Sequence, residues 1–291
     1  MFRERFLTSQ QLKKIQFFKQ MEEYPEGEYS VHTLSQNFGS SYLPFLQMLQ
    51  ELDEVLFELK ETPLFIGPSK IYWKVDPSRS NNFLMSQVKR SIPYRFLITS
   101  LLHPAKTLKE FSKETFVSES TILRRMHPLI DYLEKCNIHV NFSKMELNGR
   151  EAVLRIAYIK ALWAASLGDD LIDCKHCFND EELLLESLIP LLPLQLHPKL
   201  VRLMLCVCRL RNDQKKYLDE APFEDILFSQ TERHLDTYLS TTLDSPTQIT
   251  RNIEFLNYLF YYYPYCVKRD PQTMNPCLLY TSDAADDRIS V

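Results

Sequence analysis

The stretch "SESTILRR", residues 118–125, places three hydroxyl side chains just before two adjacent arginines. Guanidinium groups can donate paired hydrogen bonds to guanine O6 and N7 or to phosphate oxygens, and hydroxyls suit phosphates and base edges. Arg124 and Arg125 are therefore candidates for base contacts, and Ser120 and Thr121 for phosphate or base-edge contacts. These residue types at this spacing predict contact with a nucleic acid.

Apolar spacing predicts the elements that must position these groups, two helices near 107–116 and 118–135 that meet at a turn. Thr107 and Ser118 stand where N-caps are expected, because their side-chain oxygens can accept hydrogen bonds from unpaired backbone N–H groups. In a helix-turn-helix the second helix enters the major groove and the first crosses the DNA backbone. The residues predicted to turn inward are Ile122, Leu123 and Met126. The residues predicted to contact DNA are Lys109, Lys113, Ser118, Glu119, Ser120, Thr121, Arg124, Arg125 and, from a following hairpin, Lys144.

Charge is unevenly distributed along the 291-residue chain, whose formal net charge is −4. Residues 86–160 hold 13 Lys and Arg against 7 Asp and Glu, a net of +6, whereas residues 161–270 hold 11 against 17, a net of −6. Basic residues that cluster on one segment are the electrostatic pattern of nucleic-acid binding. The basic block contains both predicted helices and so points to the same site.

The same order of elements occurs twice, which predicts two tandem winged helix-turn-helix domains at residues 1–79 and 80–168 with small β wings. The first domain is predicted to have helices over 12–18, 31–38 and 43–56 and a hairpin over 63–75. The second is predicted to open with a helix that is interrupted near Pro93. Two further helices follow, one marked by Leu108, Phe111 and Phe116 and one by residues 122–133, and then a hairpin over 138–149. Scarce glycine, 5 residues in all, agrees with a mainly α fold.

The third helix of the first domain, "SSYLPFLQMLQELDEVLFELK", has no Lys or Arg before Lys60 and carries four acidic residues. Phosphate attraction supplies much of the affinity for DNA. We therefore expect the second domain to dominate binding. The first domain is expected to make a lesser contact or to serve as a packing module; the residues of that lesser contact would be Ser40, Ser41, Tyr42 and Gln47.

The segment "TLKEFSKETFVSESTILRRMHPLIDYLEKCNIHV", followed by "MELNGREAVLRIAY", resembles the second helix-turn-helix of the Mga-type virulence regulators of Gram-positive bacteria. Gly149, Glu151 and Arg155 match the family's Gly-Xaa-Glu step into an Arg-bearing helix, and the resemblance covers most of residues 1–270. It implies a DNA-binding transcriptional regulator that acts as a homodimer on double-stranded DNA. It also implies a helical region resembling the phosphotransferase-system regulation domain, and an EIIB-like self-association domain beyond residue 270.

Pro128 departs from the family pattern within the second helix of this segment. A proline inside a straight helix removes one backbone hydrogen bond and clashes one turn back, at a cost of about 3 kcal/mol. We therefore expect a kink or break near His127, which would leave the first two turns free to dock.

Residues 169–270 are predicted to form the all-helical domain, and in "LQLHPKLVRLMLCVCRLR" Pro198 favours the first position of a helix. His197 should therefore lie at the helix start, where the macrodipole disfavours the imidazolium and would stabilise an added phosphoryl group. The family resemblance implies phosphorylatable histidines. His197 is thus the candidate phosphorylation site, with His176 and His234 as weaker candidates, and phosphotransferase-system phosphocarrier proteins as candidate partners.

Other features argue against further classes of protein. "CKHC" at residues 174–177 has ligand-like spacing, but no second Cys or His pair completes a four-ligand zinc site, so we expect no metal or cofactor. No glycine-rich phosphate loop or nucleophile elbow is present, so we expect no enzyme. The absence of a long apolar run and of a disulfide framework predicts a cytoplasmic protein that does not contact a membrane. Residues 271–291 resemble translated vector sequence and are expected to be non-native.

Three functions remain open on the sequence: a DNA-binding regulator, an RNA-binding antiterminator, and a helical scaffold that binds no nucleic acid. Antiterminators of other families share the regulation domain and bind RNA. The tandem wings argue against this function, because the major groove of A-form RNA is too narrow for a recognition helix. The operator, the inducing signal and the direction of regulation are not encoded in any readable pattern. The candidate partial dimer interface consists of Leu200, Leu203, Leu205 and Val207 together with the tyrosine-rich residues 258–266.

Overall fold

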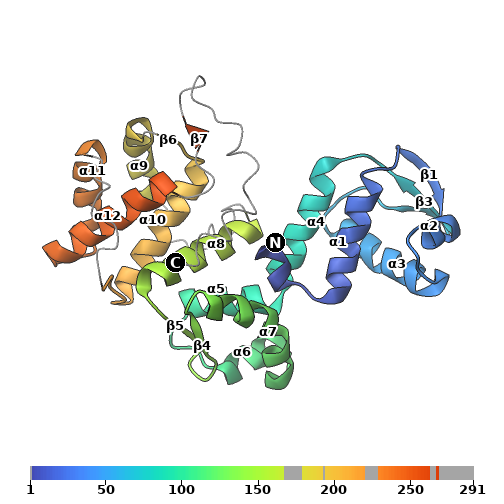
Figure 1. The fold of residues 1–291 in the computed structure, drawn as a ribbon, viewed down its shortest axis with the longest axis horizontal. Helices are drawn as coiled ribbons and strands as arrows, with labels where there is room; N and C mark the ends of the chain where they lie inside the picture. Colours follow the sequence, from blue (N-terminus) through green and yellow to red (C-terminus); the bar gives the residue numbers. More distant parts are fainter. Residues whose placement is uncertain (1, 167–178, 193, 220–228, 263–266, 269–291) are drawn as a thin grey trace. The chain divides into compact units, whose positions relative to one another are not determined.

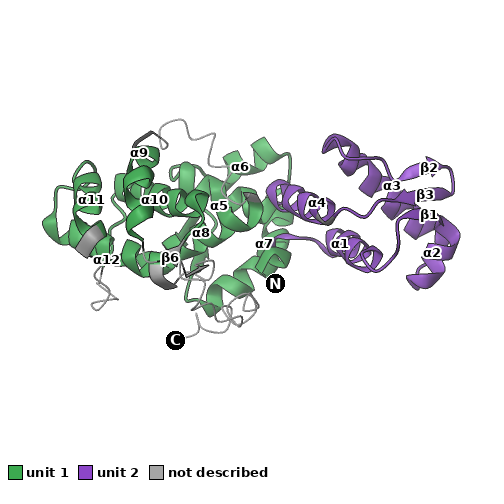
Figure 2. Cartoon of the chain, turned by 90° about the horizontal axis from the view of Figure 1, so that it is seen from above, with its two compact units in different colours: residues 1–5, 92–291 green, residues 6–91 purple. Residues whose placement is uncertain are grey.

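The computed structural model describes the chain except residues 1, 167–178, 193, 220–228, 263–266 and 269–291 (Figure 1). The described residues are mainly helical with short antiparallel strands, as predicted. They form two compact units, unit 2 with residues 6–91 and unit 1 with residues 1–5 and 92–291 (Figure 2). The "CKHC" motif and the tail over 271–291 lie outside the described residues.

Unit 2 has the predicted helices and hairpin, together with a strand that the sequence did not predict. In chain order its elements are α1 (Ser9–Met21), β1 (Gly27–Ser30), α2 (Val31–Asn37), α3 (Tyr42–Glu58), β2 (Phe65–Gly67), β3 (Lys70–Trp73) and α4 (Pro77–Arg90). The short helix η1 (Phe2–Phe6) precedes them. The unpredicted strand β1 pairs antiparallel with β3, so the sheet order is β1-β3-β2.

Aromatic packing explains why α4 belongs to unit 2. The Phe18 ring of α1 lies 5.2 Å from the Phe83 ring of α4 and 6.0 Å from the Trp73 ring of β3, measured between ring centroids. Ser91 then has an extended backbone, with φ −69° and ψ 145°, and ends α4 before Pro93, as the predicted interruption requires. The compact units therefore divide between Ser91 and Ile92, whereas the domain boundary predicted from the sequence lies between residues 79 and 80.

The first part of unit 1 consists of three helices followed by a hairpin and a long helix. Its elements are α5 (Ile92–Leu102), α6 (Leu108–Thr115), α7 (Glu119–Lys135), β4 (His139–Asn141), β5 (Glu146–Asn148) and α8 (Glu151–Ser166). Strands β4 and β5 pair antiparallel, with His139 opposite Asn148, and form the predicted wing. Helices α7 and α8 both pack on α5, so α5 is the platform for the helix-turn-helix.

The second part of unit 1 is organised around one buried helix. Its elements are α9 (Asn179–Leu188), η3 (Ile189–Leu191), β6 (Leu194–Gln195), α10 (Pro198–Asp213), α11 (Ser229–Leu239), α12 (Pro246–Tyr262) and β7 (Val267–Lys268). Helix α10 packs against α8, α9 and α12 (Figure 1). Leu200, Leu203, Leu205 and Val207 are all buried in this packing. The prediction that they supply a dimer interface is wrong, because α10 is covered on every side that carries them.

Candidate nucleic-acid interface

Helix α6 begins at a complete capping box, as its sequence predicted. The Glu110 N–H donates to Thr107 Oγ1 over 3.4 Å, and the Thr107 N–H donates to Glu110 Oε2 over 2.8 Å. The Glu110 carboxylate accepts hydrogen bonds from Thr107, and these lower the pKa of Glu110 below its ordinary value. Two of the four unpaired N–H groups at this helix end are thereby satisfied, which fixes the entry into the helix-turn-helix.

The turn between α6 and α7 is built on Phe116 in a left-handed conformation, with φ 54° and ψ 32°. The Ser112 hydroxyl bridges the turn by donating to the Val117 carbonyl over 2.6 Å. The sequence grouped Phe116 with the apolar positions that mark α6, but its side chain is 96% exposed and lies beyond the end of that helix. The reversal of chain direction at Phe116 carries its side chain out of the buried stripe of α6.

Helix α7 begins at Ser118, the predicted N-cap. The Thr121 N–H donates to Ser118 Oγ over 3.3 Å, and the Ser118 hydroxyl in turn donates to Thr121 Oγ1 over 2.9 Å. The Ser118 and Ser120 hydroxyls lie 3.2 Å apart. The structure thus gathers three of the predicted polar contacts into one hydrogen-bonded group at the positive end of the α7 dipole, where an anionic phosphate is favoured.

The rest of the first two turns of α7 separates a core face from an exposed face. Ile122 and Met126 are fully buried, while Arg124 and Arg125 are exposed. Leu123 is 41% exposed, so the prediction that it turns inward is wrong. The reason is helical geometry: successive residues are about 100° apart, which places Leu123 beside the buried stripe instead of within it.

Helix α7 is continuous through Pro128, so the predicted break near His127 does not occur. Pro128 has no N–H to give the carbonyl of Arg124, one turn earlier. Arg124 lies on the exposed face, where water can solvate that carbonyl in place of the lost bond. Both arginines therefore stand on one uninterrupted helix that begins at the Ser118 cap.

The predicted lysines surround this helix on neighbouring elements. Lys109 and Lys113 are exposed on α6, and Lys144 is exposed in the turn between β4 and β5, where its N–H donates to Asn141 Oδ1 over 3.3 Å. Glu119 is exposed at the first position of α7. Every side chain in the predicted interface is thus on α6, on the first turns of α7 or on the wing, and none is fully buried.

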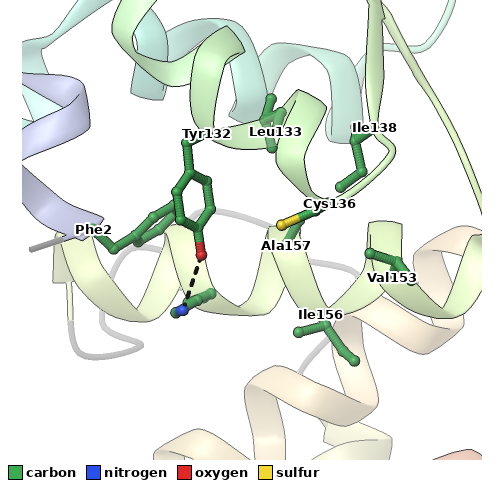
Figure 3. Close-up of a pocket in the computed structure, with 9 residues that line it drawn as sticks. Phe2, Tyr132, Leu133, Cys136, Ile138, Val153, Ile156 and Ala157 are labelled. Carbon is green, nitrogen blue, oxygen red and sulfur yellow. Dashed lines mark hydrogen bonds between the residues drawn. The ribbon is translucent and has the colours of Figure 1, made fainter. Parts of the chain in front are cut away.

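A small apolar cavity of about 20 Å³ lies behind the interface, where α7 and the wing pack on α8 (Figure 3). Tyr132 is one of the lining residues that Figure 3 labels, and its hydroxyl accepts from Lys160 Nζ over 3.1 Å. The Lys160 ammonium also lies 5.3 Å from the centre of the Phe2 ring. A space of this size holds about one water molecule, so it is a packing feature and offers no room for an effector.

A buried polar network joins the start of α8, which follows the wing, to the helical region; it is centred on Glu151 of the Gly-Xaa-Glu step and on Arg155 of the helix that the step enters. Glu151 accepts from Arg155 Nε over 3.0 Å and from Arg211 Nη2 over 2.7 Å. Arg155 also donates to Asn252 over 2.7 Å and to Asn212 over 2.8 Å. Burial lowers the pKa of Arg211, but its hydrogen bonds and charge attraction with Glu151 outweigh burial, and the pKa is raised. The contributions of Arg211, Asn212 and Asn252 had no signal in the sequence, because their partners are far away along the chain.

His197 lies where the sequence placed it, as the N-cap of α10 with φ −68° and ψ 123°. Its side chain is exposed, makes no capping hydrogen bond, and lies 5.5 Å from the Trp163 ring, edge to face. His234 is half-buried on α11, and His176 lies outside the described residues. Of the two candidate histidines that the structure describes, His197 is the more exposed.

Within the described part of the chain, no group of three or more His, Cys, Asp or Glu side chains is arranged to hold a metal ion. None of the described helices is long and apolar enough to cross a membrane.

The helix pair with its capped, exposed second helix, together with the hairpin that follows, has the architecture of a winged helix-turn-helix. Residues 77–162 match the family model described as the Mga helix-turn-helix domain. The match begins at α4, includes α6, α7 and the wing, and ends within α8; it indicates a DNA-binding transcription regulator of the helix-turn-helix class. No curated protein matches the chain.

Proposed function

We propose that this protein is a cytoplasmic, sequence-selective DNA-binding transcription regulator, not an enzyme, whose main DNA contact is the N-terminal half of α7. Arg124 and Arg125 would donate to base edges or phosphates in the major groove. Ser118, Ser120 and Thr121 would contact a phosphate at the helix N-terminus, and Lys109, Lys113 and Lys144 would neutralise the flanking backbone.

The observation that carries the proposal is the exposed, capped start of α7 inside the region that matches the Mga helix-turn-helix domain. The cap fixes the direction of the first turns, and the core residues Ile122 and Met126 hold the opposite face on the domain. Glu119 is the one acidic side chain among the proposed DNA contacts. It would select against some bases, or accept a hydrogen bond from a cytosine amino group.

We further propose that phosphorylation of His197 tunes this activity, with phosphotransferase-system phosphocarrier proteins as donors and His234 and His176 as lesser sites. An exposed imidazole at the N-terminus of α10 is accessible to a donor protein, and the helix dipole favours the negative charge of the product. Helix α10 packs on α8, which begins at the wing, so added charge at His197 has a route through packed helices to the DNA-binding part of the same unit. Regulators of this type usually act as homodimers on two-fold sites.

The test of phosphorylation compares wild type with His197→Ala after incubation with the general phosphotransferase components and phosphoenolpyruvate. The proposal expects acid-labile label on wild type and loss of most of it from His197→Ala, with His103→Ala, at an exposed histidine outside the candidate sites, as the matched control. Equal labelling of wild type and His197→Ala, or none on either, contradicts it.

The test of DNA binding compares labelled duplex DNA from genomic promoter fragments with RNA hairpins in a mobility shift at two salt concentrations. A DNA-binding regulator binds the duplex preferentially, and affinity falls steeply as salt rises, because several phosphate contacts release counterions. Preference for RNA would favour an antiterminator, and binding to neither would favour a scaffold.

A further inference from the structure

The outer face of α3 in unit 2 carries large apolar side chains that no described element covers. Leu43 is 72% exposed and Phe57 is 76% exposed, near the two ends of the helix. The opposite face of α3 is buried in the core of unit 2 through Phe45, Leu49, Leu52 and Leu56. The exposed positions recur at alternating spacings of four and three, the spacing of a helix–helix seam. We call these exposed positions the α3 stripe; it consists of Leu43, Gln47, Gln50, Glu54 and Phe57.

Charge on α3 disfavours DNA as the occupant of the α3 stripe. The helix holds no Lys or Arg, and its acidic residues all lie in its second half. Two of these are paired within unit 2, Glu51 with Lys14 at 2.9 Å and Glu58 with Arg90 at 2.5 Å. Phosphates would be repelled by this face, because DNA affinity depends on neutralising them.

The α3 stripe is self-complementary about Gln50. Leu43 and Phe57 are each seven residues from Gln50, so an antiparallel pairing of two copies around a two-fold axis at Gln50 sets Leu43 of one copy against Phe57 of the other. Gln50 then meets Gln50 of the second copy, and a primary amide can both donate to and accept from another. Each apolar residue finds an apolar partner in this register.

The same pairing separates the two Glu54 carboxylates, and Glu51, one residue from the axis, is paired with Lys14 of its own copy. Glu54 of one copy falls beside Gln47 of the other, in the half of α3 that has no acidic residue. The acidic half of each helix also points toward the N-terminal end of its partner, which carries the positive end of the helix dipole. A parallel pairing would instead set Glu54 against Glu54, and like charges directly opposed are destabilising.

We propose that the α3 stripe is a homodimerisation surface, occupied by the same stripe of a second copy of this chain in antiparallel orientation. Helix α3, which has the position of a recognition helix in unit 2, then pairs with α3 of the second copy, and α7 in unit 1 remains available to DNA. The inference rests on the α3 stripe alone and holds whether or not α7 reads DNA.

The experiment uses the symmetry of Gln50 and the full 291-residue chain. Gln50→Glu sets two carboxylates against each other at the axis, and Gln50→Lys sets two ammonium groups there. The dissociation constant of each variant dimer is expected to rise by about tenfold or more in sedimentation equilibrium. Mixing the two variants in equal amounts should restore dimers, since each pair then holds opposite charges, and native mass spectrometry should find them to be mixed dimers.

Gln16→Glu and Gln16→Lys, at an exposed glutamine of α1 in the same unit, are the matched controls and should leave wild-type dimerisation unchanged. Both glutamines are exposed, so all four variants should fold, and thermal melts check this. A wild type that stays monomeric at high concentration overturns the proposal. So does a dimer indifferent to both Gln50 variants, or a mixture that forms no mixed dimers. If Gln50→Glu weakens duplex binding without changing the oligomeric state, α3 contacts DNA, and the pairing is overturned.

Discussion

Arg155 Nη1 donates to Asn252 Oδ1 over 2.7 Å, although the two residues are 97 positions apart in the chain. The bond joins α8, which starts at the wing, to α12 in the helical region. Arg155 is fully buried, and it also donates to Glu151, Asn212 and the Lys216 carbonyl. One guanidinium therefore links the helix α8 that follows the wing to the α10 end and to α12, beside the Glu151–Arg211 pair.

Replacing Arg155 by methionine should destabilise unit 1 by about 3–5 kcal/mol, because Glu151, Asn212 and Asn252 each lose a buried hydrogen bond, although Glu151 keeps its bonds from Arg211. Urea unfolding followed by circular dichroism measures this loss. Arg95→Met, at an exposed arginine of α5 in the same unit, is the control and should change stability by no more than about 0.5 kcal/mol. Equal effects of the two substitutions would show that the network carries no stability.

Replacing Ser118 by alanine should cost about 1 kcal/mol, because α7 loses the oxygen that accepts from the Thr121 N–H. Ser118→Gly should cost only a few tenths of this, since glycine tolerates the cap conformation. Ser120→Ala, at an exposed hydroxyl that does not cap the helix, should leave stability nearly unchanged. Thermal unfolding of the three variants separates these outcomes, and equal losses from Ser118→Ala and Ser120→Ala would remove Ser118 as the cap.

Replacing Phe116 by glycine should stabilise the helix-turn-helix by up to about 1 kcal/mol, because a left-handed conformation is costly for residues with a Cβ and natural for glycine. The side chain is exposed, so little packing is lost with it. Phe116→Ala keeps the backbone strain and should bring no such gain. A glycine variant that melts below the alanine variant would show that the turn is not strained.

Alkaline stability should depend on Tyr238, whose hydroxyl donates to the buried Glu181 over 2.6 Å. Burial, and then the negative charge of Glu181, raise the pKa of Tyr238 above its ordinary value of 10.0. The folded protein then keeps the proton at a pH where the unfolded chain releases it, so this contribution to stability is complete below about pH 10 and falls as pH rises above it.

In Tyr238→Phe the alkaline fall in stability should be smaller by about 1.4 kcal/mol per pH unit. At neutral pH the same variant should lose about 1–3 kcal/mol, since Glu181 loses a hydrogen bond. Urea unfolding at pH 8 and at pH 11 checks both effects. A variant with the same fall in stability between these two pH values as wild type would contradict the assignment.

Local patterns predicted most of the fold, because most of its elements are set by nearby residues. Thr107 and Ser118 have the residue types that cap helices, and both do so. Strand β1 escaped prediction because its four residues are held by β3, some forty positions later in the chain. Phe116 and Leu123 were misplaced because apolar type alone does not say whether a residue at a turn or beside a stripe is covered. The partners of Arg155 depend on the packing of three helices, which no spacing rule encodes.

DNA binding by the start of α7 is tested by the double variant Arg124→Ala and Arg125→Ala. Its affinity for promoter duplexes is measured by mobility shift at several salt concentrations. Both side chains are exposed, so the variant should fold as wild type does. Lys13→Ala combined with Lys19→Ala, which also removes two exposed positive charges but from α1, is the matched control. We expect the arginine variant to lose at least about 2 kcal/mol of binding free energy, roughly thirtyfold in affinity, with a shallower salt dependence, while the lysine variant stays near wild type. Unchanged affinity and salt dependence in the arginine variant would contradict DNA binding by the start of α7.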